Sequence, residues 1–133
     1  MHRKLLALLA ASLLATTALA ADAPLVTAEV LQKRSAAADP SLVILDVRTP
    51  AEFAAGHVPG AINITSDTLS SHLKKLPKGR EVIAYCRGPY CLLSVDAVAM
   101  LREKGYRARR MEDGFPEWKA SGLPVESQSA TAD

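Results

Sequence analysis

Two cysteines, Cys86 and Cys91, are the residues of this chain best suited to chemistry. Cys86 directly follows an apolar run of strand length, residues 82–85, and apolar residues at helical spacing begin at Cys91. A loop between a strand end and a helix N-terminus can aim several backbone N–H groups at one point, where the helix end adds partial positive charge. Both effects stabilise a thiolate, so this position favours a nucleophilic Cys86 over an inert buried cysteine.

The rest of the loop fits an anionic substrate. Arg87 supplies a permanent positive charge that can hold an anion, although an arginine here is also compatible with a solvated surface charge. Gly88 allows the positive φ angles that a tight loop needs, whereas Pro89 has no N–H group to donate to the sulfur. We expect the substrate-binding loop to consist of Arg87, Gly88, Pro89, Tyr90 and Cys91.

Cys91 has two interpretations that the sequence leaves open. Two cysteines on one curled loop can form a disulfide if their Cα atoms lie about 4.4–6.8 Å apart. Alternatively, Cys91 is only the first buried residue of its helix. The pair also suits a redox, sulfur or soft-metal sensing module that works without turnover.

Strands and helices alternate along the chain and must position these residues. The pattern predicts an α/β fold with a small parallel sheet covered by helices on both faces, and ligands bound beyond the carboxyl ends of the strands. The last strand is expected at an edge of the sheet. We predict strands at residues 42–45, 61–64, 82–85 and 106–111, and helices at residues 27–34, 50–55, 69–76, 91–104 and 115–120.

Residues 1–20 have the layout of a secretory signal peptide. Arg3 and Lys4 precede an almost unbroken apolar run, residues 5–14, and small residues around Ala20 provide a cleavage site. The apolar run is too short for a membrane-spanning helix. We therefore predict cleavage after Ala20, a periplasmic or secreted location, and no stable membrane insertion of the mature protein.

The charge balance of the chain changes when this segment is set aside. The full 133 residues contain 16 Lys and Arg against 14 Asp and Glu, and the excess lies at Arg3 and Lys4. Binding to nucleic acid or to an anionic membrane would require a basic excess, which the mature chain lacks. We expect one domain at residues 21–126 and a disordered tail of small and polar residues at 127–133.

The chain resembles the rhodanese family over nearly all of its predicted mature length. The resemblance implies a sulfurtransferase that acts by double displacement without a metal or organic cofactor. Cys86 attacks the outer sulfur of thiosulfate, or of a persulfide or polysulfide donor, and the resulting persulfide passes its sulfur to a thiophilic acceptor. The matching segments, in the family's order, are LDVRTPAEF at 45–53, GHVPGAIN at 56–63, VIAYCR at 82–87, DGFPEW at 113–118 and GLP at 122–124.

The resemblance also implies roles outside the loop. Asp46 and Arg48 follow the first strand and are expected either to brace the active-site loop or to serve the fold alone. Gly114 is expected to approach the loop closely. Trp118 is expected in the core or as a lid near the loop. His57 is expected to be hydrogen-bonded in a turn, because a stabilised thiolate needs no separate base. If Cys91 lies within disulfide distance of Cys86, it can attack the implied persulfide, release sulfide and leave a disulfide. The implied partners are a small sulfur compound and a thiol acceptor.

Overall fold

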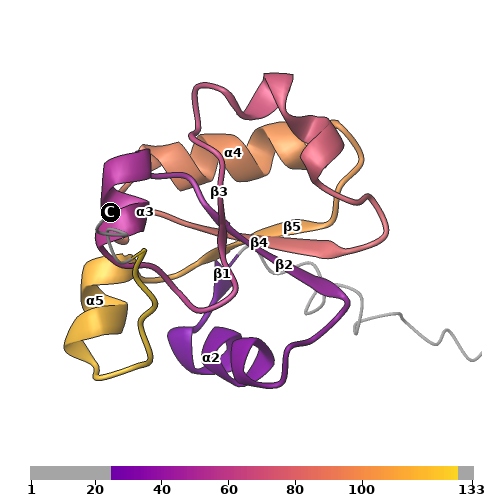
Figure 1. The fold of residues 1–133 in the computed structure, drawn as a ribbon. Helices are drawn as coiled ribbons and strands as arrows, with labels where there is room; N and C mark the ends of the chain where they lie inside the picture. Colours follow the sequence, from indigo (N-terminus) through magenta and orange to yellow (C-terminus); the bar gives the residue numbers. More distant parts are fainter. Residues whose placement is uncertain (1–24, 129–133) are drawn as a thin grey trace, which may run out of the picture.

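The computed structural model describes residues 25–128, which form a five-stranded parallel sheet with helices on both faces (Figure 1). The strand order β1-β5-β4-β2-β3 places β4 in the middle of the sheet. The predicted leader, residues 1–20, and residues 129–133 of the predicted tail lie outside the described residues. The strands are β1 (Leu25–Val26), β2 (Leu42–Asp46), β3 (Ile62–Asn63), β4 (Glu81–Tyr85) and β5 (Ala108–Met111). The helices are α2 (Ala28–Ala36), α3 (Pro50–Ala55), α4 (Leu92–Glu103) and α5 (Phe115–Ala120), with 3-10 helices η1 (Leu69–Ser71) and η2 (Leu73–Lys75).

Side chains of the central strands alternate between the two faces of the sheet. Leu45 of β2 packs in a cluster with Leu101 of α4, whereas its neighbour Ile44 packs with Leu31 of α2 and Trp118 of α5. In Figure 1, α4 accordingly lies above the sheet and α2 and α5 lie below it. Each such apolar side chain contributes about 1.5–3 kcal/mol when it is fully buried. The packing on both faces of the central strands therefore fixes the position of the loop that follows β4.

Side-chain caps confirm two of the predicted helix starts, those at Thr27 and Pro50. The Thr27 hydroxyl accepts a hydrogen bond from the Val30 N–H at 3.2 Å at the start of α2. Thr49 and Glu52 form a reciprocal capping box around Pro50 at the start of α3. The predicted stop of α4 is also confirmed, because Gly105 follows its C-cap with a φ of +91°.

The prediction that the last strand lies at an edge is wrong. β5 lies between β4 and the two-residue strand β1, which pairs Leu25 with Arg110 and Val26 with Met111. A two-residue strand is too short to show an apolar period, so its pairing depends on the completed sheet. The other edge is β3, where Ile62 is 38% exposed although its apolar run predicted a buried strand.

The single helix predicted over residues 69–76 is also wrong. The chain forms η1 and η2 instead and leaves helical geometry at His72, where φ is −120° and ψ is 19°. Thr68 does not cap this segment, since its hydroxyl bonds to Thr65. Without a cap, and with Pro77 close behind, a continuous helix of this length is not favoured. Within residues 25–128 no helix is long and apolar enough to cross a membrane.

Candidate active site

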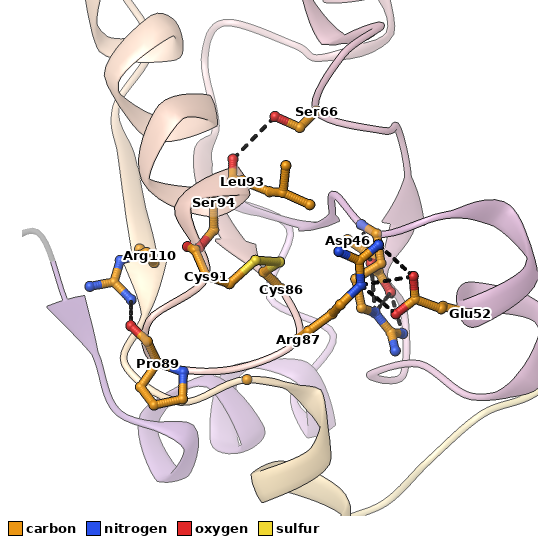
Figure 2. The surroundings of a disulfide bond; sticks show 12 residues. Asp46, Glu52, Ser66, Cys86, Arg87, Pro89, Cys91, Leu93, Ser94 and Arg110 are labelled. Carbon is orange, nitrogen blue, oxygen red and sulfur yellow. Dashed lines mark hydrogen bonds and ion pairs between the residues drawn. A yellow bond between two sulfur atoms is a disulfide. The ribbon is translucent and has the colours of Figure 1, made fainter.

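Cys86 lies at the carboxyl end of the central strand β4, and a six-residue loop leads from it to Cys91, the N-cap residue of α4. The two sulfur atoms are bonded at 2.05 Å, and the Cα atoms are 6.2 Å apart (Figure 2). The pairing that the sequence left open is therefore formed in this structure. Cys86 is 1% exposed and Cys91 is partly exposed. Cys86, which the sequence predicted as the nucleophile, is therefore held in a disulfide and has no free thiolate in this structure.

The turn between β5 and α5 packs against the start of the loop and holds it in place. Gly114 lies so close to it that an added Cβ would stand 2.1 Å from the Gly88 nitrogen and 2.4 Å from the Arg87 carbonyl carbon. The Phe115 N–H also donates to the Cys86 carbonyl at 2.9 Å. The close approach predicted for Gly114 is present, and its physical basis is backbone packed on backbone with no room for a side chain.

A second anchor fixes the middle of the loop. The Arg110 guanidinium of β5 donates from Nη1 to the Pro89 carbonyl at 3.2 Å (Figure 2). The next residue, Tyr90, is 94% exposed. Within the loop, the Cys91 N–H donates to the Gly88 carbonyl at 3.2 Å and closes a turn. The loop backbone is thus held at several points while Tyr90 faces solvent.

Arg87 is paired with a carboxylate that the sequence interpretation did not assign to the site. Its Nη2 and Nε atoms donate to the Glu52 carboxylate of α3 at 2.7 Å and 2.8 Å. These hydrogen bonds lower the pKa of Glu52 from 4.5 to about 2. The guanidinium expected to hold an anionic substrate is therefore engaged by an anion of the protein itself. The signal available in the sequence was the Thr49–Glu52 capping pattern, which places Glu52 in the first turn of α3.

Asp46 and Arg48 form a buried ion pair at the end of β2. Arg48 Nη2 lies 2.6 Å from Asp46 Oδ2, and the Tyr85 hydroxyl donates to the same oxygen at 2.7 Å. Arg48 also donates to the Gly56 carbonyl at 2.7 Å. Burial and the Asp46 charge both raise the pKa of Tyr85. Among the described residues, no hydrogen bond of either side chain reaches residues 86–91; the pair holds Tyr85, the residue before Cys86.

Trp118 belongs to the core and is not a lid. It is 1% exposed, and its indole Nε1 donates to the Pro124 carbonyl at 2.8 Å. His57 has the turn role expected of it: Nδ1 is 2.7 Å from the Phe53 carbonyl oxygen, and the two rings stack with centroids 3.7 Å apart. Both side chains stabilise the fold around the site.

A cavity of about 490 Å³ lies beside the loop, at the carboxyl ends of the strands. The Ser66 hydroxyl donates to the Leu93 carbonyl at 3.2 Å across one side of it. The Thr65–Asp67 segment was missed because it follows a two-residue strand and has no motif. A larger cavity of about 610 Å³ lies at the starts of β4 and β5, and no residue of the 86–91 loop lines it. The residues lining the cavity beside the loop are Val47, Arg48, Thr49, Pro50, Thr65, Ser66, Asp67, Arg87 and Leu93.

The groups gathered at the loop suit sulfur chemistry. Within residues 25–128, no cluster of three or more His, Cys, Asp or Glu side chains is placed to hold a metal ion. The loop brings together the two bonded sulfur atoms, the N-terminus of α4 and the Arg87–Glu52 ion pair. Such a loop can stabilise negative charge on a sulfur atom.

Comparisons relate this chain to proteins already known. The family model for the rhodanese-like domain matches residues 27–121. The chain is 43% identical over 99 residues to the HTH-type transcriptional regulator Rv0324 of Mycobacterium tuberculosis, a match that covers 74% of this chain but only 42% of that protein. It is 34% identical over 101 residues to a protein named Sulfurtransferase from Allochromatium vinosum, covering 75% of this chain and 92% of the relative. The solved structure of the BH2092 protein from Bacillus halodurans matches with a TM-score of 0.73 and 26% identity, covering 81% of this chain and 80% of that one.

Proposed function

Because the chain belongs to the rhodanese-like family, as a match over residues 27–121 shows, we propose that it transfers sulfane sulfur through a persulfide on Cys86. The relative named Sulfurtransferase, which is 34% identical to this chain, supports a rhodanese-type sulfurtransferase. The observation that carries the assignment to Cys86 is its position at the end of β4, under a loop that leads to the N-terminus of α4.

The first half of the reaction loads Cys86 with sulfur. The Cys86 thiolate attacks the outer sulfur of thiosulfate, the sulfur–sulfur bond of thiosulfate breaks, and sulfite leaves with the bonding electron pair. In the second half, a thiol acceptor attacks the outer sulfur of the persulfide and regenerates the Cys86 thiolate. Dividing the transfer in this way replaces one difficult step by two easier ones. No metal or organic cofactor takes part, and a persulfide or polysulfide can replace thiosulfate as donor.

The loop supplies electrostatic stabilisation for both halves. Negative charge on Cys86 lies beside the N-terminus of the 12-residue helix α4, where first-turn N–H groups carry partial positive charge. Pro89 contributes no N–H to this set. Arg87 binds an anionic substrate only when that substrate competes successfully with Glu52 for the guanidinium. The disulfide must be reduced before Cys86 can react.

A single-turnover experiment tests the proposal. The reduced chain, mixed with thiosulfate in the absence of any acceptor, should release one sulfite per chain as a burst. Cys86→Ser should release none. If the reduced wild-type chain gives no burst with thiosulfate and acquires no sulfur from polysulfide or persulfide donors, the chain is not a sulfurtransferase acting through Cys86.

A second candidate is a sensing module that uses Cys86 and Cys91 without turnover. It is supported by the disulfide and by the similarity to a protein named a transcriptional regulator. Such a module would bind sulfur or a soft metal stoichiometrically, and thiol acceptors would not drive continuous sulfite release. Steady turnover with an acceptor thiol contradicts this candidate and supports the enzyme.

We also propose that the chain is exported and works in an oxidising compartment. The layout of residues 1–20 supports this location, and the disulfide is compatible with it. The mass of the protein isolated from its native cells tests it. A mature N-terminus at Ala21 is expected, and retention of residues 1–20 on protein in the cytoplasm would contradict export.

A further inference from the structure

We propose that Cys91 is a second catalytic cysteine, which releases the sulfur of the Cys86 persulfide as sulfide and leaves the disulfide seen in the structure. This inference rests on the proposed persulfide at Cys86. It gives the protein a further activity, the reduction of sulfane sulfur to sulfide, and it makes a dithiol the second substrate.

The geometry places the two sulfur atoms within bonding distance on one fixed loop. Their Cα atoms are 6.2 Å apart, within the usual range for a disulfide, and the bond is formed. The Phe115 N–H holds the Cys86 carbonyl and Arg110 holds the Pro89 carbonyl, so the backbone is anchored at the first residue of the loop and in its middle. Cys91 therefore reaches Cys86 without any rearrangement that would unfold the loop.

Cys91 is also placed to act as a nucleophile. It is the N-cap residue of α4, and its side chain accepts no capping hydrogen bond. The N-terminus of a helix stabilises a thiolate at this position. Cys91 packs on one side against the apolar core, but it is partly exposed and its sulfur is bonded to the Cys86 sulfur.

The resolving step is balanced without an outside oxidant. The Cys91 thiolate attacks the Cys86 Sγ atom, and the bond between that atom and the outer sulfur breaks. The outer sulfur leaves with the electron pair as hydrosulfide. The outer sulfur is thereby reduced from sulfane sulfur to sulfide, and the two cysteines are oxidised to the disulfide.

A dithiol must then reduce the disulfide, and the two sulfur atoms differ in access. Cys86 is 1% exposed, whereas Cys91 is partly exposed and lies between Tyr90 and Leu92, which are 94% and 69% exposed. A thiolate of the reductant attacks Cys91, and Cys86 leaves as a thiolate. The second thiol of the reductant attacks the reductant's own sulfur in this mixed disulfide and frees Cys91.

Overall, thiosulfate and a dithiol give sulfite, sulfide and an oxidised dithiol. A dithiol-regenerating reaction must precede this cycle, and a sulfide-consuming reaction can follow it.

The resolving step is tested in one turnover. The purified chain is reduced, freed of reductant and mixed with one equivalent of thiosulfate. The wild type should release one sulfide per chain without added thiol and finish with the Cys86–Cys91 disulfide. Cys91→Ser and Cys91→Ala should keep one added sulfur on Cys86 and release sulfide at least about tenfold more slowly, because the internal nucleophile is absent.

The two Cys91 variants are matched controls for a structural role of the N-cap. Serine caps a helix well and alanine poorly, so a structural role would separate them, whereas loss of the thiol affects both equally. Sulfide release from both variants at the wild-type rate, or a wild-type chain that keeps its persulfide, overturns the role of Cys91 and leaves the Cys86 persulfide intact. Failure of all three chains to acquire sulfur overturns the Cys86 persulfide as well.

The entry point of the reductant is tested by trapping. The oxidised chain is treated briefly with glutathione while iodoacetamide blocks the freed thiol. Trypsin then cleaves after Arg80, Arg87 and Arg102 and separates Cys86, in residues 81–87, from Cys91, in residues 88–102. Glutathione is expected on residues 88–102. Glutathione on residues 81–87 would contradict attack at Cys91.

Discussion

Gly114 is the residue on which the shape of the active-site loop depends most directly. Its lack of a side chain lets the turn before α5 press against Gly88, and the Phe115 N–H then reaches the Cys86 carbonyl. The sequence placed Gly114 near the loop through a family resemblance, but the contact itself is between backbones far apart in the chain. Such a contact has no local pattern that a sequence could show.

Gly114→Ala should destabilise the protein by about 1–3 kcal/mol, as overpacking does, and should reduce the sulfite burst because the loop must move. Urea unfolding and the burst amplitude measure the two effects. Gly79→Ala is the matched control, because an added Cβ at Gly79 meets no atom within 4 Å. Equal stability and equal bursts in the two variants would show that the close contact is unimportant.

The Arg87–Glu52 pair is the residue-scale feature that sequence reasoning missed. Arg87 was expected to face a substrate anion, yet its donors are taken by Glu52 across the space between the loop and α3. Neither residue carries information about the other in a single sequence. Because the Arg87 side chain is 48% exposed, solvent screens the pair and its contribution to stability is small.

Glu52→Gln should lower stability by less than about 1 kcal/mol near neutral pH, since the pair is exposed. The folded pKa of Glu52 is lowered from 4.5 to about 2, so its stabilising effect is present above pH 4.5 and is lost as the pH falls from 4.5 towards 2. The difference in unfolding free energy between wild type and variant, measured across this range, should shrink with acid. A difference that grows as the pH falls would contradict the pair.

At the scale of elements, the ends of β2 and β4 are tied together by Asp46, Arg48 and Tyr85. The Asp46 carboxylate accepts from both partners, and the resulting network fixes the last residue of β4 before Cys86. The sequence correctly placed Asp46 and Arg48 at a strand end. It did not show that they act on Tyr85 and on the Gly56 carbonyl, because these contacts require the assembled sheet.

Asp46→Asn should be strongly destabilising, by about 3–5 kcal/mol, because it leaves the buried Arg48 without its counter-charge. Chemical denaturation provides the measurement. Asp96→Asn changes an exposed carboxylate on α4 and serves as the control, with little expected effect. If the two variants were equally stable, the buried ion pair would not be what holds the end of β4.

At the scale of the whole molecule, the elements next to the site were predictable and the order of the strands was not. The caps at Thr27 and Thr49 and the strand before Cys86 are local signals, and each defines an element that the structure contains. The position of β5 inside the sheet depends on β1, whose two residues show no pattern. The disulfide also depends on the assembled fold, since it joins the end of the central strand to the start of α4.

Reduction of the Cys86–Cys91 bond should lower the free energy of unfolding by about 2 kcal/mol, because the short closed loop restricts the unfolded chain only modestly. Urea unfolding with and without dithiothreitol measures this change. Cys91→Ser should show no dependence on dithiothreitol. Loss of the fold on reduction would contradict the account, because catalysis requires a folded protein with free thiols.

Locating the transferred sulfur shows whether Cys86 carries the persulfide. The reduced Cys91→Ser chain, in which no internal thiol can remove a persulfide, is treated with thiosulfate and digested with trypsin. One added sulfur atom is expected on the peptide of residues 81–87, which contains Cys86, and none in a Cys86→Ser chain treated in the same way. A chain that remains unmodified at Cys86 with thiosulfate, polysulfide and persulfide donors alike would contradict this role of Cys86.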